Sequence, residues 1–114
     1  MFEVTLYKDA QGYSPIREYI SSLPRKQQNK IIAYMDRLAQ FGFDLKRPTA
    51  DNLGGGLGLY ELRPERHRVL YFFHQRTKIV LLHAFLKRTD EIPQRDIQIA
   101  LKRKADYLER GGLS

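Results

Sequence analysis

The sequence has 114 residues, of which 42% are hydrophobic and 29% charged, and it contains no cysteine. This length and composition predict one globular domain over residues 1–114, and the lack of cysteine excludes disulfides, zinc–thiolate sites and cysteine nucleophiles. Lysine and arginine number 20 against 13 aspartate and glutamate residues, a net charge of +7 that favours a polyanionic partner such as nucleic acid.

Nothing in the sequence indicates a membrane protein. No apolar run approaches the roughly 18 residues that a membrane-spanning helix requires, and residues 1–4 lack the basic and apolar segments of a signal peptide. We therefore expect a cytoplasmic protein. Charge alone leaves two alternatives to a nucleic-acid ligand: an acidic protein partner, and a basic surface that is merely solvated.

The N-terminal part of the chain predicts one strand and a helical hairpin. Apolar and polar side chains alternate over residues 2–7, which predicts a strand with one buried face. A Ser-Pro pair, preferred at the N-cap and first position of a helix, starts a short helix over residues 14–22. Pro24 starts a second helix that ends at Gly42, and its buried face is expected to contain Ile31, Ile32, Met35, Leu38 and Ala39.

The middle of the chain is irregular at first and then rich in strand signals. Residues 46–58 contain Pro48 and several glycines, and they predict a flexible connector. A phosphate-binding loop is disfavoured because it needs Lys followed by Ser or Thr, and then a helix. Residues 59–63, 68–73 and 78–86 predict three strands joined by short links, and hence antiparallel hairpins. The third run is apolar on both faces, which predicts an interior strand.

A last helix is expected after Pro93 and before the glycines at residues 111–112. Its apolar line is formed by residues at helical spacing: Ile97, Ala100, Leu101 and Leu108. The resulting element order is β-α-α-β-β-β-α. This order predicts an α+β fold in which a small, antiparallel-rich sheet is flanked by helices.

The most basic segment is residues 63–78, with five Lys or Arg residues against one Glu. If the first hairpin turns at residues 65–66, Arg63 lies directly opposite Arg68, on the same face as Glu61. Two opposed arginines are destabilising unless an anion lies between them, so the pair predicts a phosphate site. The alternative is that Glu61, or another acid, is that anion. The opposite face is expected to be core, with Tyr60, Leu62, Val69 and Tyr71.

A second group of bases, Lys87 and Arg88, follows the third predicted strand. Strand alternation places Lys87 on the same face as His83 and Phe85. These bases can therefore converge with those of the neighbouring hairpin. The alternative is an ordinary solvated strand end.

The three histidines, His67, His74 and His83, have no metal-ligand spacing with one another or with acids. We therefore expect no metal and no cofactor. His67, in the turn between Arg66 and Arg68, is the best placed to exchange a proton, although a merely solvated side chain is the simpler interpretation. His83 is expected to be half-buried and hydrogen-bonded.

Four short segments carry a resemblance through their order and spacing: LYELR at residues 59–63, HRVLYF at 67–72, IVLLHAFLKRT at 79–89 and DIQIA at 96–100. Together they resemble the RelE/ParE superfamily of toxins, and more closely its HigB-like, phage-derived branch. The resemblance implies the toxin of a type II toxin–antitoxin system. Its activity would be that of a metal-independent endoribonuclease that cuts messenger RNA on the ribosome. It also implies a cognate antitoxin, often with a helix-turn-helix domain.

The resemblance further implies roles for individual residues. The family's phosphate-contacting arginine corresponds to Arg68, and its basic pair at the strand end corresponds to Lys87 and Arg88. These three are the expected catalytic residues. The base is not carried over from the family; because a neighbouring cation can lower the pKa of a lysine, Lys87, beside Arg88, is the expected base. The residues expected to bind RNA are Arg63, Arg66 and His67.

The chain departs from the family pattern in two places. The superfamily's best-studied ribonucleases have lysines where this chain has Leu59 and Glu61, and a tyrosine where it has residues 91–93. The proton-transfer groups therefore stay open among Glu61, His67, Lys87 and Asp90. Because gyrase-poisoning relatives share the fold without cleaving RNA, two alternatives remain. They are a ParE-like poison of DNA gyrase and a basic RNA- or DNA-binding module.

Overall fold

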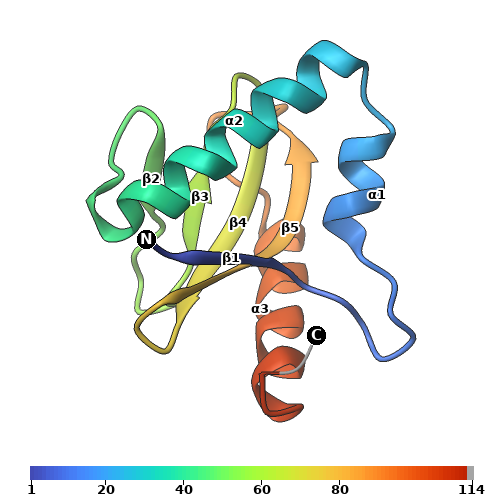
Figure 1. The fold of residues 1–114 in the computed structure, drawn as a ribbon, viewed down its shortest axis with the longest axis vertical. Helices are drawn as coiled ribbons and strands as arrows, with labels where there is room; N and C mark the ends of the chain where they lie inside the picture. Colours follow the sequence, from blue (N-terminus) through green and yellow to red (C-terminus); the bar gives the residue numbers. More distant parts are fainter. Residues whose placement is uncertain (113–114) are drawn as a thin grey trace.

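The computed structural model describes residues 1–112. Its elements are β1 (Glu3–Leu6), α1 (Pro15–Ser21), α2 (Arg25–Phe41), the 3-10 helix η1 (Gly42–Asp44), β2 (Ala50–Asn52), β3 (Tyr60–Leu62), β4 (His67–His74), β5 (Lys78–Leu86) and α3 (Gln94–Glu109). Figure 1 shows a twisted sheet between α2 and α3, with α1 beside α2, which confirms the predicted α+β class. None of these helices has the length and apolarity needed to cross a membrane.

The sheet has five strands in the order β1-β5-β4-β3-β2. β1 runs parallel to β5, and the other neighbours are antiparallel. β5 therefore lies between two strands, as its two apolar faces predict. β2 corrects the expectation of a connector over residues 46–58. It has only three residues, too few to show an alternating pattern, and its conformation depends on pairing with β3.

Side chains on both faces of the sheet are buried, in two clusters. The cluster beneath α3 contains Tyr7, Leu59, Leu70, Phe72, Val80, Leu82, Ala100 and Tyr107. The cluster beneath α1 and α2 contains Ile16, Leu38, Ala50, Leu62, Val69, Tyr71, Ile79 and Leu81, with Tyr60 packed against it. The core face predicted for the first hairpin is therefore confirmed, and its other face is buried in part as well.

The start of α1 and the end of α2 lie at the capping residues that the sequence predicts. Ser14 Oγ accepts a hydrogen bond from the Arg17 amide at 3.3 Å, and Pro15 is the first residue of α1, as predicted. α2 ends at Gly42, where φ is +49°. A Cβ at Gly42 would lie 2.0 Å from the ring of Phe2. Only glycine therefore allows the N-terminal residues to pack against this corner.

The buried face of α3 differs from the prediction at one position. Ala100 is fully buried, but Leu108 is 45% exposed and the adjacent Tyr107 is 1% exposed. The Tyr107 ring meets the rings of Phe72 and His74 edge-on, at centroid distances of 5.9 and 5.3 Å. Aromatic contacts of this kind are invisible to a ranking of residues by hydrophobicity, which favours leucine.

An irregularity in β5 decides which side chains reach the sheet face beneath α3. The register between β4 and β5 shifts by one residue between Leu70 and Tyr71, so β5 carries a bulge. Beyond the bulge, Phe85 packs in the cluster beneath α3 while Ala84 packs in the other. Arg68 pairs directly with Phe85. The start of β4 and the end of β5 thus present polar side chains to one common face.

Candidate functional site

A cleft of about 330 Å³ opens where β4 begins and β5 ends. It is lined by Glu65, Arg66, Arg68, Lys87, Arg88, Thr89 and Asp90. The two strand ends are tied together because the Lys87 amide donates a hydrogen bond to the Arg66 carbonyl at 2.7 Å. The cleft brings together five of the residues singled out in the sequence: Arg66, Arg68, Lys87, Arg88 and Asp90.

Arg68 is held in one position. Its side chain is 12% exposed, and Nη1 donates hydrogen bonds to the carbonyls of Glu65 and His67 at 2.8 Å each. Its Nε lies 3.7 Å from Glu61 Oε2. Burial lowers the pKa of Arg68 below the ordinary arginine value, and the Glu61 carboxylate opposes this effect. Arginine stays protonated even so, which makes Arg68 a preorganised cation on the wall of the cleft.

Glu61 is the anion that lies between Arg63 and Arg68, the two arginines predicted to face each other. Its side chain is 5% exposed, and it accepts a hydrogen bond from Arg63 Nε at 2.6 Å in addition to its ion pair with Arg68. Of the two interpretations of the arginine pair, the structure therefore shows the one with an internal acid. Asp51 also pairs with Arg63 and with Arg47, so three guanidinium groups face two carboxylates here and a net positive charge remains.

Arg63 lies beside the cleft and does not line it. The β3–β4 ladder ends at Leu62, and the Arg63 amide donates to the Thr49 carbonyl at 2.8 Å. The expected pairing of Arg63 directly across from Arg68 is therefore absent from the ladder. The Arg63 side chain also lies 3.5 Å from Asp51, in a neighbouring depression of about 400 Å³.

Lys87 and Arg88 form the opposite wall of the cleft. Lys87 Nζ lies 3.5 Å from Asp90 Oδ1, and the Asp90 side chain is fully exposed. Arg88 is also exposed. Exposed ion pairs are weak, so the ammonium and the carboxylate can both rearrange around a ligand.

His67 is buried, which corrects the expectation of a solvated turn histidine. It is 3% exposed, Nδ1 lies 2.7 Å from the Tyr19 hydroxyl, and Nε2 lies 2.9 Å from Gln27 Oε1. Because Gln27 Oε1 only accepts, Nε2 carries the proton and Nδ1 accepts from Tyr19. Burial lowers the pKa of His67. The residue therefore fastens the turn to α1 and α2 rather than facing the cleft.

His83 is half-buried and hydrogen-bonded, as predicted. Its Nε2 donates to Asp96 Oδ1 at 2.7 Å, and Nδ1 lies 3.3 Å from Arg103 Nη1. Burial lowers the pKa of His83, while the Asp96 hydrogen bond raises it in part. The ring also stacks on Phe85 at 5.4 Å. This network supports Phe85, which pairs directly with Arg68 in the β4–β5 ladder. The contacts from Asp96 and Arg103 could not be predicted, because no local pattern in the sequence pairs these α3 residues with β5.

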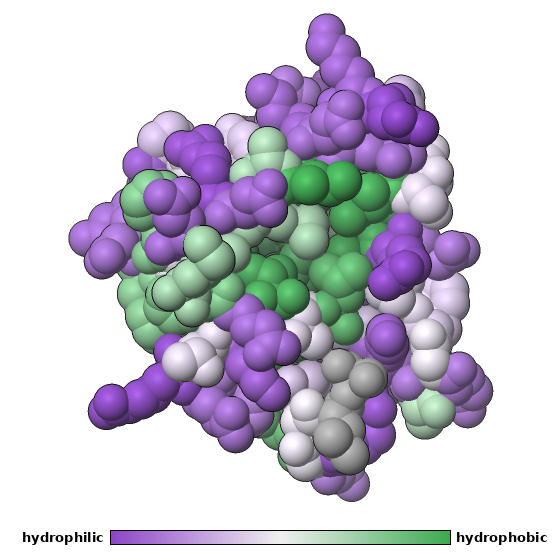
Figure 2. All heavy atoms as spheres, in the orientation of Figure 1, coloured by the Kyte–Doolittle hydropathy of each residue, from purple (hydrophilic) through white to green (hydrophobic). Residues whose placement is uncertain are grey.

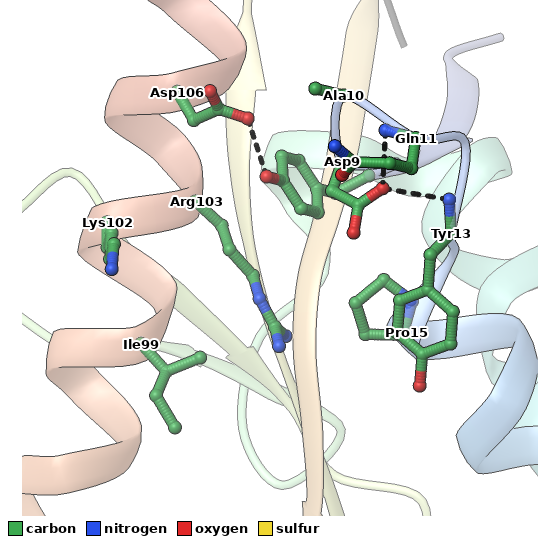
Figure 3. Close-up of a pocket in the computed structure, with 10 residues that line it drawn as sticks. Asp9, Ala10, Gln11, Tyr13, Pro15, Ile99, Lys102, Arg103 and Asp106 are labelled. Atoms are coloured by element: carbon green, nitrogen blue, oxygen red, sulfur yellow. Dashed lines mark hydrogen bonds between the residues drawn. The ribbon is translucent and has the colours of Figure 1, made fainter.

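A roomier groove of about 550 Å³ lies between the loop of residues 9–15 and α3 (Figure 3). Tyr7 donates a hydrogen bond to Asp106 Oδ2 at 2.6 Å, and Asp9 Oδ1 accepts from the amides of Gln11 and Tyr13. The charged residues on its walls are balanced: Asp9, Asp106, Lys102 and Arg103. No residue of the predicted site lines this groove. Charge therefore favours the smaller cleft as the place for a polyanion.

The cleft can bind phosphate through charge and hydrogen bonding alone. Within residues 1–112, no group of three or more histidine, aspartate or glutamate side chains is arranged to hold a metal ion. Planar guanidinium donors match phosphate oxygens in pairs, and the lysine adds a compact point charge.

One protein-family model matches a part of the chain that includes every residue lining the cleft. The model of the phage-derived Gp49-like proteins (DUF891) matches residues 18–105, which include α2, every residue lining the cleft and most of α3. No curated protein gives a significant match. The matched family is associated with RelE/HigB-like toxins of toxin–antitoxin systems. The chain belongs to the Gp49-like family of phage-derived proteins.

Proposed function

We propose that this protein is the toxin of a type II toxin–antitoxin pair and cleaves messenger RNA on the ribosome, as a HigB-like member of the RelE/ParE superfamily. The observation that carries the proposal is the meeting of Arg66, Arg68, Lys87 and Arg88 around one cleft, with Arg68 fixed by backbone carbonyls. Ribosome-bound messenger RNA places the site of action in the cytoplasm.

RNA carries its own nucleophile. The 2′-hydroxyl attacks the adjacent phosphorus, the bond to the 5′ oxygen breaks, and the products are a 2′,3′-cyclic phosphate and a 5′-hydroxyl. Negative charge builds on the phosphate oxygens during this step. Arg68 is preorganised to stabilise that charge, assisted by Lys87 and Arg88. The step requires no metal and no cofactor.

The positions of the four candidate proton-transfer groups support a choice between them. Glu61 and His67 are buried and bound to other side chains of the protein, whereas Lys87 and Asp90 line the cleft. As an ion pair, the Asp90 carboxylate can accept the proton of the 2′-hydroxyl, and the Lys87 ammonium can donate one to the leaving oxygen. This assignment gives Lys87 the role of acid instead of the role of base that its position beside Arg88 in the sequence suggests.

A cognate antitoxin is the protein partner in this proposal. A chain with a net charge of +7 and a cationic cleft suits a partner with acidic segments that cover Arg68 and Lys87. Coexpression with the product of the adjacent reading frame, followed by pulldown, should recover a tight complex. The lack of any binding at micromolar concentration would contradict the pairing.

One observation favours a second candidate, a ParE-like poison of DNA gyrase. Glu61 is buried where the superfamily's ribonucleases carry a lysine, and it neutralises part of the arginine charge. A protein target needs less positive charge than an RNA phosphate does.

Cleavage by the purified protein separates the two candidates. Message bound to ribosomes, and message alone, would be incubated with the protein and mapped by primer extension. The proposal predicts cuts that disappear with Arg68→Ala and persist with Arg76→Ala, an exposed residue in the β4–β5 turn. Intact message together with inhibited supercoiling by gyrase would support the poison instead.

A further inference from the structure

A second hollow, at the β2 edge of the sheet, combines aromatic and basic side chains. It has a volume of about 540 Å³ and is lined by Phe43, Leu45, Lys46, Arg47, Ala50, Asp51, Asn52 and Tyr60. Phe43 in η1 is 55% exposed. In Figure 2, apolar side chains gather on this side of the molecule, around the position that the N-terminus and η1 occupy in Figure 1.

The exposed ring of Phe43 is fixed by its neighbours. It stacks on Phe73 at a centroid distance of 3.8 Å and meets Phe2 edge-on at 5.6 Å. Tyr60, on the other side of the hollow, meets Phe73 edge-on at 4.9 Å and stacks on Tyr71 at 5.5 Å. A braced aromatic ring with a large exposed area is a platform on which an unpaired base can stack.

A chain of ion pairs leads from this hollow to the cleft. Asp51 pairs with Arg47 at 2.8 Å and with Arg63 at 3.5 Å, and Glu61 pairs with Arg63 at 2.6 Å and with Arg68 at 3.7 Å. Asp51 and Glu61 are directly opposite each other in the β2–β3 register. Two opposed carboxylates are destabilising unless a cation lies between them, and Arg63 fills that place. These ion pairs thus connect three arginines in a row: Arg47 before β2, Arg63 just after β3 and Arg68 in β4.

The surface between the two sites is hollowed along the same line. The depression that contains Arg63 shares Arg47, Asp51 and Asn52 with the aromatic hollow, and it shares Asp90 with the cleft. We define the RNA trough as these three connected depressions. Its residues include seven cations, Lys46, Arg47, Arg63, Arg66, Arg68, Lys87 and Arg88, against five acids, Asp51, Glu61, Glu65, Asp90 and Glu91.

We propose that the RNA trough binds a single strand of RNA whose scissile phosphate lies in the cleft and one of whose unpaired bases stacks on Phe43 in the aromatic hollow. This inference rests on the proposed ribonuclease function and adds to it a base-contacting subsite remote from the cut. Single strands suit such a surface because a basic groove follows the backbone while aromatic rings hold the bases. The excess of cations would attract an acidic peptide as well as RNA, but the exposed ring of Phe43 favours a chain with bases that can stack on it. Binding of an acidic peptide is therefore an outcome of the test.

The test compares a long and a short RNA by fluorescence anisotropy. The probes are a labelled single-stranded RNA of about 12 nucleotides, within the range of known single-strand sites, and a dinucleotide that fills the cleft alone. Phe43→Ala should weaken binding of the long probe by about tenfold, the size typical of one lost stacking contact, and leave the dinucleotide unaffected. Phe43→Tyr keeps a ring and should bind like the wild type. Ile32→Ala is the matched control, because Ile32 on α2 is 45% exposed and not buried, contrary to the prediction from the sequence.

A second measurement does not depend on a variant folding. Wild-type protein irradiated with the long probe carrying 4-thiouridine should form a crosslink at Phe43 or Tyr60, mapped by mass spectrometry. Unchanged long-probe binding by a folded Phe43→Ala protein, or crosslinks confined to the cleft, would overturn the subsite while leaving the ribonuclease intact. If the Phe43→Ala protein binds RNA like the wild type but no longer binds the antitoxin, the hollow is a binding site for the antitoxin and not for RNA. If Arg68→Ala has no effect on cleavage, the proposed function itself fails.

Discussion

Replacing Arg68 by alanine removes a cation that lines the cleft and is held there by hydrogen bonds to the backbone. Nη1 donates to two carbonyls, Nε pairs with Glu61, and the side chain is 12% exposed. Loss of one preorganised electrostatic donor costs about 3 kcal/mol in the transition state, a drop of roughly a hundredfold in rate. Cleavage of a reporter message and growth arrest on induction are the assays.

The same substitution should also reduce stability, because Arg68 is not an ordinary surface charge. The carbonyls of Glu65 and His67 lose a donor, and Glu61 keeps only Arg63 as its partner on this side. Removing one partner of such contacts typically costs about 1–3 kcal/mol, which a thermal melt detects. Arg68→Lys should restore charge but only part of the rate, since an ammonium cannot bind two oxygens in one plane.

Arg76→Ala provides the matched control, because it removes one exposed arginine at the far end of the β4–β5 hairpin. This variant should retain full toxicity and its melting temperature. A folded Arg68→Ala protein with full toxicity would refute the assignment of the cleft. It would also remove the main support for a ribonuclease over a gyrase poison.

Three further predictions concern stability and metals. Gly42→Ala should destabilise by about 2–4 kcal/mol, because a Cβ there meets Phe2 and φ is positive. Gly56→Ala, at positive φ in open space, should cost only about 1 kcal/mol in the same melt. Burial lowers the pKa of His67 and His83 below the ordinary 6.5, so the unfolded chain binds more protons below that pH. The melting temperature should therefore fall as the pH is lowered from about 7 to 5.5, and less so in a His67→Gln, His83→Gln variant. Because ribosomes need magnesium, the metal test omits manganese and zinc instead of adding EDTA. Cleavage of ribosome-bound message should persist; a strict need for added manganese or zinc would contradict the chemistry.

Much of the fold is predictable because local signals and the fold agree. Ser14 and Pro15 begin α1 as their types indicate, and the pairing of Glu61 with Leu70 follows from the short hairpin link. The element order follows from periodicity over long segments. These features depend on residues close together in the chain.

The missed features depend on contacts between distant residues. β2 exists only as a partner of β3, and the bulge in β5 is defined only by its register with β4. His67 is buried because Tyr19 and Gln27, more than a helix away in sequence, supply hydrogen bonds to both ring nitrogens. The basic residues of the cleft could be named from the sequence, but the acids that hold them in place could not be assigned to their partners.

Attack of the 2′-hydroxyl leaves a 5′-hydroxyl end on the RNA downstream of each cut. Sequencing of RNA that carries 5′-hydroxyl ends, before and shortly after induction, therefore detects this chemistry in the cell. New 5′-hydroxyl ends should arise within messages in cells with the wild-type protein, and Arg68→Ala should abolish them. Growth arrest without new ends in any message would contradict this chemistry.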